Sequence, residues 1–188
     1  APAAPARDVV EHSAPGAALA LEPRGAYETG LFDEAAAEIV AHYPAAQRLL
    51  VVSAAAATVQ VLDVADADDP TLLFELVTEG VGDIPAGAVA NSVDVRGDGL
   101  AVVAVEAPEK TDRGWLAFFD VSGAEGQPLG AVRVGAQPDM VTLTSDGRRA
   151  VVANEGEPAE DYSVDPEGSI SVVDLPRRLA APSQQDAR

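Results

Sequence analysis

The chain has 188 residues, of which 31 are acidic and 12 basic, so its formal net charge at pH 7 is −19. A surface of this charge repels phosphate backbones and anionic lipid headgroups, which argues against nucleic-acid and membrane partners. The sequence contains no cysteine, so disulfides, thiolate metal ligands and cysteine nucleophiles are excluded together.

The first 20 residues are rich in Ala, Pro and Gly and lack a sustained hydrophobic period, which predicts a flexible leader. The opening run, Ala1-Pro-Ala-Ala-Pro-Ala6, is typical of the stretch that follows a signal-peptidase cut, so we expect a secreted or cell-surface protein. No apolar run approaches the roughly 18 residues of a membrane span, which argues against direct membrane insertion.

The first predicted strand lies at 37–41, although alanine and glutamate in 32–40 favour a helix. The repeats that follow assign this segment to a strand, so we expect tertiary context to override propensity. Further strands are predicted at 48–53, 58–64 and 72–77, and the acidic stretch 63–70 is interpreted as a solvated link.

The same succession of short apolar runs then returns twice. The second unit has runs at 91–95, 99–104, 115–121 and 129–134, and the third at 139–143, 149–154 and 169–175. Aligned on their second runs, the units begin 51 and 50 residues apart. Glycines in the turns 96–99 and 145–147 supply the positive φ that tight hairpins need.

About four short antiparallel strands in every 40–50 residues are typical of a propeller blade. We therefore predict an all-β fold, a partial β-propeller over 21–176, with about three four-stranded blades of an incomplete ring at about 36–80, 89–135 and 137–176. A β-sandwich is the alternative, but repetition of one strand phrase argues against it. Residues 177–188 are expected to form a disordered tail.

Rings generally close with about four to eight blades, so three leave the ring open. Either the protein continues beyond Arg188, or another chain or another copy of this chain pairs with the exposed edges and completes the propeller.

Several ordered motifs resemble the choice-of-anchor I family. They are the segments 25–41, 90–93, 137–140, 152–158 and 165–172. The resemblance implies a bacterial exported β-propeller similar to the mesenchyme-specific cell-surface glycoproteins of biomineralising animals. Because many members carry alkaline-phosphatase or phytase-like labels, it also implies a phosphoesterase activity. This chain resembles the N-terminal part of the family domain.

The starts of the first strands carry the first candidate site. In the repeat alignment Ala37, Asn91 and Asp139 are equivalent, and Glu38 follows Ala37. Innermost strands line the channel of a propeller, so Glu38, Asn91 and Asp139 are expected to direct oxygens toward it as a cation or ligand site. The alternative is that these residues cap strand ends and bond to loop backbone.

The ends of the second strands add Glu106, Asn154 and Glu155 to these candidates. Carboxylate and amide oxygens are the donors that Ca2+ prefers, so Ca2+ is the expected cofactor; the alternative is a solvated rim. The loop 155–168 contributes further acidic candidates, although it lacks the spacing of an EF-hand. They are Glu157, Asp161, Asp165 and Glu167.

Catalytic motifs are absent: the sequence contains no G-x-S-x-G, H-E-x-x-H or G-x-x-x-x-G-K-[ST]. The only histidines are His12 and His42, so neither a histidine triad nor a zinc site is expected. We therefore expect a non-catalytic surface module that binds divalent cations or partners through its acidic channel rim.

Two other functions remain open. One is a calcium-dependent phosphoesterase that needs the remaining blades, for which Lys110 and Arg113 are the nearest candidates to receive phosphate. The other is an interaction scaffold that binds protein partners on one face.

Overall fold

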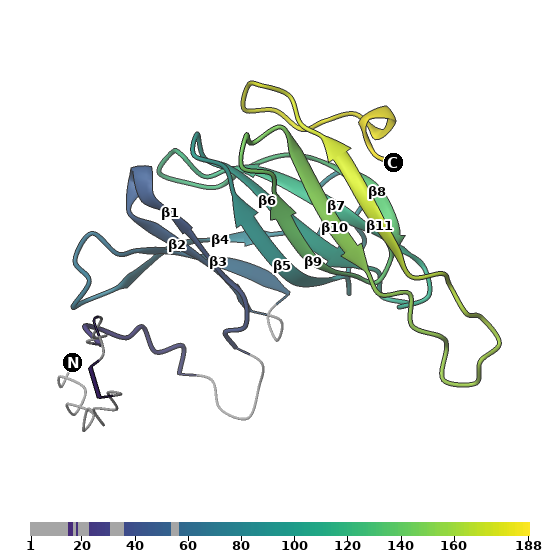
Figure 1. Cartoon of the computed structure of the whole chain (residues 1–188), viewed down its shortest axis with the longest axis horizontal. Helices are drawn as coiled ribbons and strands as arrows, with labels where there is room; N and C mark the ends of the chain where they lie inside the picture. The colour runs from purple at the N-terminus through teal and green to yellow at the C-terminus, as the bar shows by residue number, and fades with distance from the viewer. Residues whose placement is uncertain (1–14, 17, 19–22, 31–35, 54–56) are drawn as a thin grey trace.

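The structure is a computed structural model that describes residues 15–16, 18, 23–30, 36–53 and 57–188 (Figure 1). Most of the expected leader lies outside these residues. Within them, eleven strands form three separate antiparallel sheets, which confirms the all-β prediction. No helix in the described part of the chain is long and apolar enough to cross a membrane.

Each sheet is a meander in which strands that follow one another in sequence are hydrogen-bonded neighbours. The first sheet contains β1 (Val40–Tyr43), β2 (Arg48–Ser53), β3 (Thr58–Asp63) and β4 (Thr71–Val77). The second contains β5 (Val89–Val95), β6 (Leu100–Glu106), β7 (Arg113–Asp120) and β8 (Gln127–Ala136). The third contains β9 (Pro138–Leu143), β10 (Arg149–Asn154) and β11 (Ser169–Asp174).

All eleven predicted apolar runs become strands, and β2 and β10 have the predicted bounds. The largest shift is in the first strand, which was expected at 37–41 and begins at Val40. The backbone before it already pairs with β2, because Glu38 N–H donates to Val52 O and Val52 N–H donates to Ile39 O. Residues 36–39 are therefore extended and do not form a helix.

A shared backbone hydrogen bond defines the repeat in the structure. In each sheet the residue after the third strand donates its N–H to the carbonyl just before the second strand. The pairs are Val64 to Gln47 at 2.9 Å, Val121 to Gly99 at 2.9 Å and Leu175 to Arg148 at 2.7 Å. These equivalences correct the alignment made from sequence. The spacing between the first and second units is one residue longer than predicted, and the spacing between the second and third units is one residue shorter.

In the corrected register, Val51, Val103 and Val152 are equivalent, and they pair with Val40, Val93 and Val141 on the innermost strands. Val93 is 3% exposed and Val141 1% exposed, whereas Val40 is 59% exposed. The difference arises because Val93 and Val141 each face the sheet that precedes theirs, and no described sheet precedes the first one.

The second sheet lies between the other two, as Figure 1 shows for the teal strands. Side chains alternate between the two faces of a strand, so β6 contributes to two cores. Val103 and Val105 pack with the first sheet, and Val102 and Ala104 pack with the third. Burial on both faces explains why every residue from Leu100 to Val105 is apolar and has no exposed surface.

The C-terminal segment differs from the expected disordered tail. Val172 and Arg188 exchange backbone hydrogen bonds of 2.8 and 2.9 Å, and Val173 forms an antiparallel bridge with Ala187. The end of the chain thus pairs with the outer edge of β11, where the third sheet has no fourth strand of its own. This pairing depends on a return of the chain that short-range sequence patterns do not encode.

Candidate functional site

Asn91 and Asp139, two of the predicted site residues, occupy the same irregularity in their innermost strands, and Glu38 lies at the equivalent point of the first sheet. The register shifts by one residue between Ala90 and Ser92, and again between Pro138 and Met140, which leaves Asn91 and Asp139 at β-bulges. In the first sheet, Glu38 is the residue opposite Val52 at the equivalent point. Glu38, and not Ala37, therefore corresponds to Asn91 and Asp139.

The bulges lie at the end of the sheets where the second strands finish, because paired strands run antiparallel. Bulges turn a strand locally and redirect its side chains, and they are common beside functional sites. Because of the antiparallel pairing, the candidates at the starts of the first strands and those at the ends of the second strands lie at the same end of the molecule.

Asn91 and Glu106 are in direct contact in the structure. Asn91 Nδ2 donates to Glu106 Oε2 at 3.0 Å and to the carbonyl oxygen of Pro138 at 3.2 Å. Both side chains are half-buried. The amide thus orients the Glu106 carboxylate and ties the second sheet to the start of β9.

Two more polar contacts continue this seam between β5 and β9. Ser92 Oγ accepts the backbone N–H of Val141 at 3.2 Å, and Asp94 Oδ2 accepts that of Leu143 at 2.7 Å. Side chains of one innermost strand therefore satisfy the backbone of the next, which holds Asp139 in a fixed position relative to Asn91.

Glu155 follows β10, and its backbone N–H donates to Gln137 O at 2.9 Å. Partial desolvation raises the pKa of its carboxyl group, and the negative charges of Asp139, Glu157 and Glu106 raise it further. We call these four carboxylates, Glu106, Asp139, Glu155 and Glu157, the acidic rim. They come from three segments, the end of β6, the start of β9 and the loop after β10, and the other three act on Glu155 through their charges.

In the structure, the side chains of the acidic rim are not arranged as a complete metal-binding site. Among the described residues, no three histidine or acidic side chains are arranged to hold a metal ion. Glu38 is exposed before β1. The rim could supply the hard oxygen donors that Ca2+ prefers only with some movement of these side chains.

Asn154, another predicted ligand, is 3% exposed and is fully engaged in hydrogen bonds. Its Nδ2 donates to Ser171 Oγ at 3.0 Å and to Ser169 Oγ at 3.2 Å, and its Oδ1 accepts the N–H of Gly135 at 3.2 Å. The side chain therefore points between the second and third sheets, away from the rim, and joins them. The alternation of side chains along β10 separates it from Glu155.

The loop candidates have different surroundings. Glu157 accepts from Lys110 Nζ at 3.1 Å, a contact that lowers the pKa of the carboxyl group, and its backbone N–H bonds to Gln137 Oε1 at 3.0 Å. The pKa of Asp161 is lowered by its hydrogen bonds with Ser163. Asp165 and Glu167 are exposed on the return arm of the loop.

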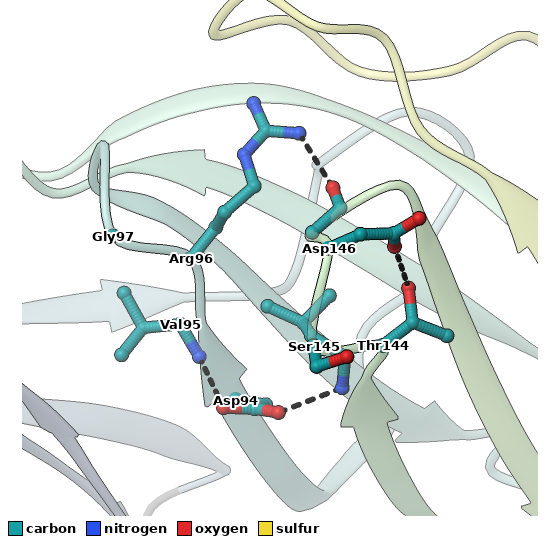
Figure 2. A pocket seen from close by; sticks show the side chains of 9 residues that line it. Asp94, Val95, Arg96, Gly97, Thr144, Ser145 and Asp146 are labelled. Carbon is teal, nitrogen blue, oxygen red and sulfur yellow. Dashed lines mark hydrogen bonds between the residues drawn. The ribbon is translucent and has the colours of Figure 1, made fainter.

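A pocket of about 370 Å3 lies at the opposite end, between the β5–β6 and β9–β10 turns (Figure 2). Arg96 crosses its edge and donates to both oxygens of Asp98, at 2.8 and 2.9 Å, and to the carbonyl oxygens of Gly147 and Pro176. Thr144 donates to Asp146 at 2.7 Å. These groups form hydrogen bonds with one another, so we interpret the pocket as part of the contact between the second and third sheets. No sequence motif predicted it.

Three sequential antiparallel meanders packed face to face define a β-propeller-like protein. Residues 38–187 match the choice-of-anchor I domain, so the chain belongs to that family. No curated protein matches this sequence.

Solved structures with similar folds share little sequence with the chain. A Lactobacillus plantarum protein matches with a TM-score of 0.60 and 18% identity, over 81% of this chain and 42% of that one. Saccharomyces cerevisiae Sqt1 gives 0.55 and 11%, over 84% and 37%. Kuenenia stuttgartiensis hydrazine synthase gives 0.53 and 17%, over 73% and 34%. The chain spans less than half the length of each, and the likeness concerns the fold alone.

Proposed function

We propose that this chain is an exported or cell-surface β-propeller module that binds a divalent cation, with Ca2+ preferred, at the acidic rim. The observation that carries the proposal is the gathering of Glu106, Asp139, Glu155 and Glu157 at the end of the sheets where the second strands finish. Partial desolvation, followed by the charges of the other three carboxylates, raises the pKa of Glu155. A divalent cation relieves this repulsion and prefers the oxygen donors present there. Membership of the choice-of-anchor I family supports a surface location.

We infer further that the three sheets are three blades of an incomplete ring. Supporting this, equivalent valines are buried wherever a neighbouring sheet covers them and accessible at the two outer faces. Val103 and Val152 have no exposed surface, whereas Val51 in the first sheet is half-buried. On the other face Val102 is buried, and its equivalent Val151 in the third sheet is half-buried. Another chain, another copy or further blades would cover these faces.

Calorimetric titration of the full chain with Ca2+, after treatment with EDTA and its removal, tests cation binding. We expect saturable binding that Glu155→Gln and Asp139→Asn each weaken by about tenfold, since each removes one charged donor. Glu125→Gln, in the exposed β7–β8 connection, makes the same change of charge elsewhere and should bind normally. Equal affinity in all variants, or no binding, would contradict the proposal.

A calcium-dependent phosphoesterase is the second candidate, and the presence of Lys110 beside the rim favours it. Its ammonium group contacts Glu157 at 3.1 Å and lies where it could meet a phosphate oxygen. Arg113 is less suitable, because its Nε donates to the carbonyl oxygen of Val134. Turnover of p-nitrophenyl phosphate by the Ca2+-loaded chain, lost in Asp139→Asn, would support the enzyme; no turnover would support the non-catalytic module.

A further inference from the structure

We propose that the β10–β11 loop, residues 155–168, is a docking finger through which Tyr162 and Val164 bind a cationic partner protein. Figure 1 shows this loop extending beyond the ends of β10 and β11, away from the three sheets. The inference does not depend on cation binding at the acidic rim, because it concerns the far end of the loop.

The base of the finger is anchored to the sheets. Glu155 N–H donates to Gln137 O at 2.9 Å, and Glu157 is bonded to both Lys110 and Gln137. The two arms touch at Gly156, where a Cβ atom would lie 2.7 Å from the backbone nitrogen of Gly168. The finger therefore leaves the sheet in a defined direction.

The tip is a closed turn. Ala159 N–H donates to Val164 O at 2.8 Å, and Tyr162 N–H donates to Ala159 O at 2.9 Å. Asp161 accepts from the N–H and hydroxyl groups of Ser163, at 3.0 and 2.6 Å. Because these bonds order the tip in the free protein, binding costs less conformational entropy than it would for an open loop.

Tyr162 is presented to solvent in an uncommon conformation. Its φ is 58°, a left-handed value that bulky residues rarely adopt, and the residue is 76% exposed. Val164, across the turn, is 50% exposed. An ordered turn that holds an aromatic and an aliphatic side chain in water matches the anchor residues of protein interfaces, among which tyrosine is enriched.

The charges around the tip indicate the chemistry of the partner. Four acidic residues lie on the finger between Pro158 and Gly168, and the stretch contains no lysine or arginine; they are Glu160, Asp161, Asp165 and Glu167. Lys110, at the base, is already paired with Glu157. The complementary surface is therefore one in which arginine or lysine side chains surround an apolar slot, and an arginine can also stack on Tyr162.

Fluorescence anisotropy with a short labelled peptide of alternating arginine and leucine tests the proposal on the full chain, in EDTA. We expect binding that Tyr162→Asn and Val164→Ser each weaken by about tenfold. Asparagine tolerates the left-handed conformation, so Tyr162→Asn removes the aromatic ring with little strain on the turn. A peptide of alternating glutamate and leucine should not bind.

Two control variants distinguish binding at the fingertip from binding elsewhere on the chain. Ile170→Ser changes an apolar residue of β11 that is 63% exposed outside the finger, and Glu125→Gln removes one acidic charge from the exposed β7–β8 connection. Both variants should bind the arginine–leucine peptide normally. If the Tyr162 and Val164 variants bind the peptide as tightly as the parent chain does, binding is due to general charge attraction, and the inference is overturned. Failure of the peptide to bind the parent chain would overturn it as well.

Discussion

Single glycines and amides determine how closely the sheets approach. Gly135 lies against the buried Asn154, and a Cβ at Gly135 would stand 2.6 Å from Asn154 Cγ. The two residues are also linked by the hydrogen bond from Gly135 N–H to Asn154 Oδ1. The second and third sheets therefore meet at a point where only glycine fits.

Gly135→Ala should lower the free energy of unfolding by about 1–3 kcal/mol, because the methyl group must displace a side chain that already has four hydrogen-bond contacts. Urea unfolding monitored by the fluorescence of the single tryptophan measures the change. Gly123→Ala is the matched control, since a Cβ atom at that position would make only ordinary van der Waals contact. Equal stability of the two variants would show that this contact is not tight.

Glu155→Gln should stabilise the cation-free protein at neutral pH. The folded protein raises the pKa of Glu155 above its unfolded value, so the charged form is the less favourable one in the fold. The advantage of the variant should disappear as the pH falls below the ordinary carboxyl pKa, where both forms are neutral. Thermal unfolding in EDTA across this range measures it; a lower Tm for the variant at neutral pH would contradict the assigned repulsion.

At the scale of secondary structure, sequence patterns located every strand but not their exact correspondence. The repeated short apolar runs were sufficient to locate β2 and β10. The start of β1 and the equivalence of Glu38 with Asn91 were misaligned, because the hairpin between the first two strands is one residue shorter in the second sheet than in the other two. For the candidate site, the sequence predicted that the candidates at strand starts and strand ends lie at the same end of the sheets. It did not predict that Asn154 points between the second and third sheets, because that direction depends on tertiary packing.

The polar seam between β5 and β9 is testable at this scale. Asp94→Ala removes the acceptor for the backbone N–H of Leu143 and should lower the free energy of unfolding by about 1 kcal/mol, since both residues are half-buried. Hydrogen exchange at the Leu143 amide should accelerate. Asp120→Ala, which removes bonds only to the nearby Ser122, should leave that amide unchanged. Unchanged exchange in Asp94→Ala would show that the seam does not order β9.

At the scale of the whole molecule, three similar sheets are stacked in chain order, and the middle one is the best covered. The outer faces carry accessible apolar residues, such as Val40 at 59% and Ile170 at 63% exposure. Propellers bury such faces against neighbouring blades, so these are the surfaces that completion of a ring would remove from water.

Thiol labelling tests this architecture most directly, because the chain contains no cysteine of its own. The variants Val40→Cys, Val93→Cys and Val141→Cys place one thiol at each equivalent position of the innermost strands. We predict rapid reaction with a maleimide at position 40 and reaction at 93 and 141 only after unfolding. Rapid labelling at 93 or 141 in the folded chain would contradict the stacking of three equivalent sheets.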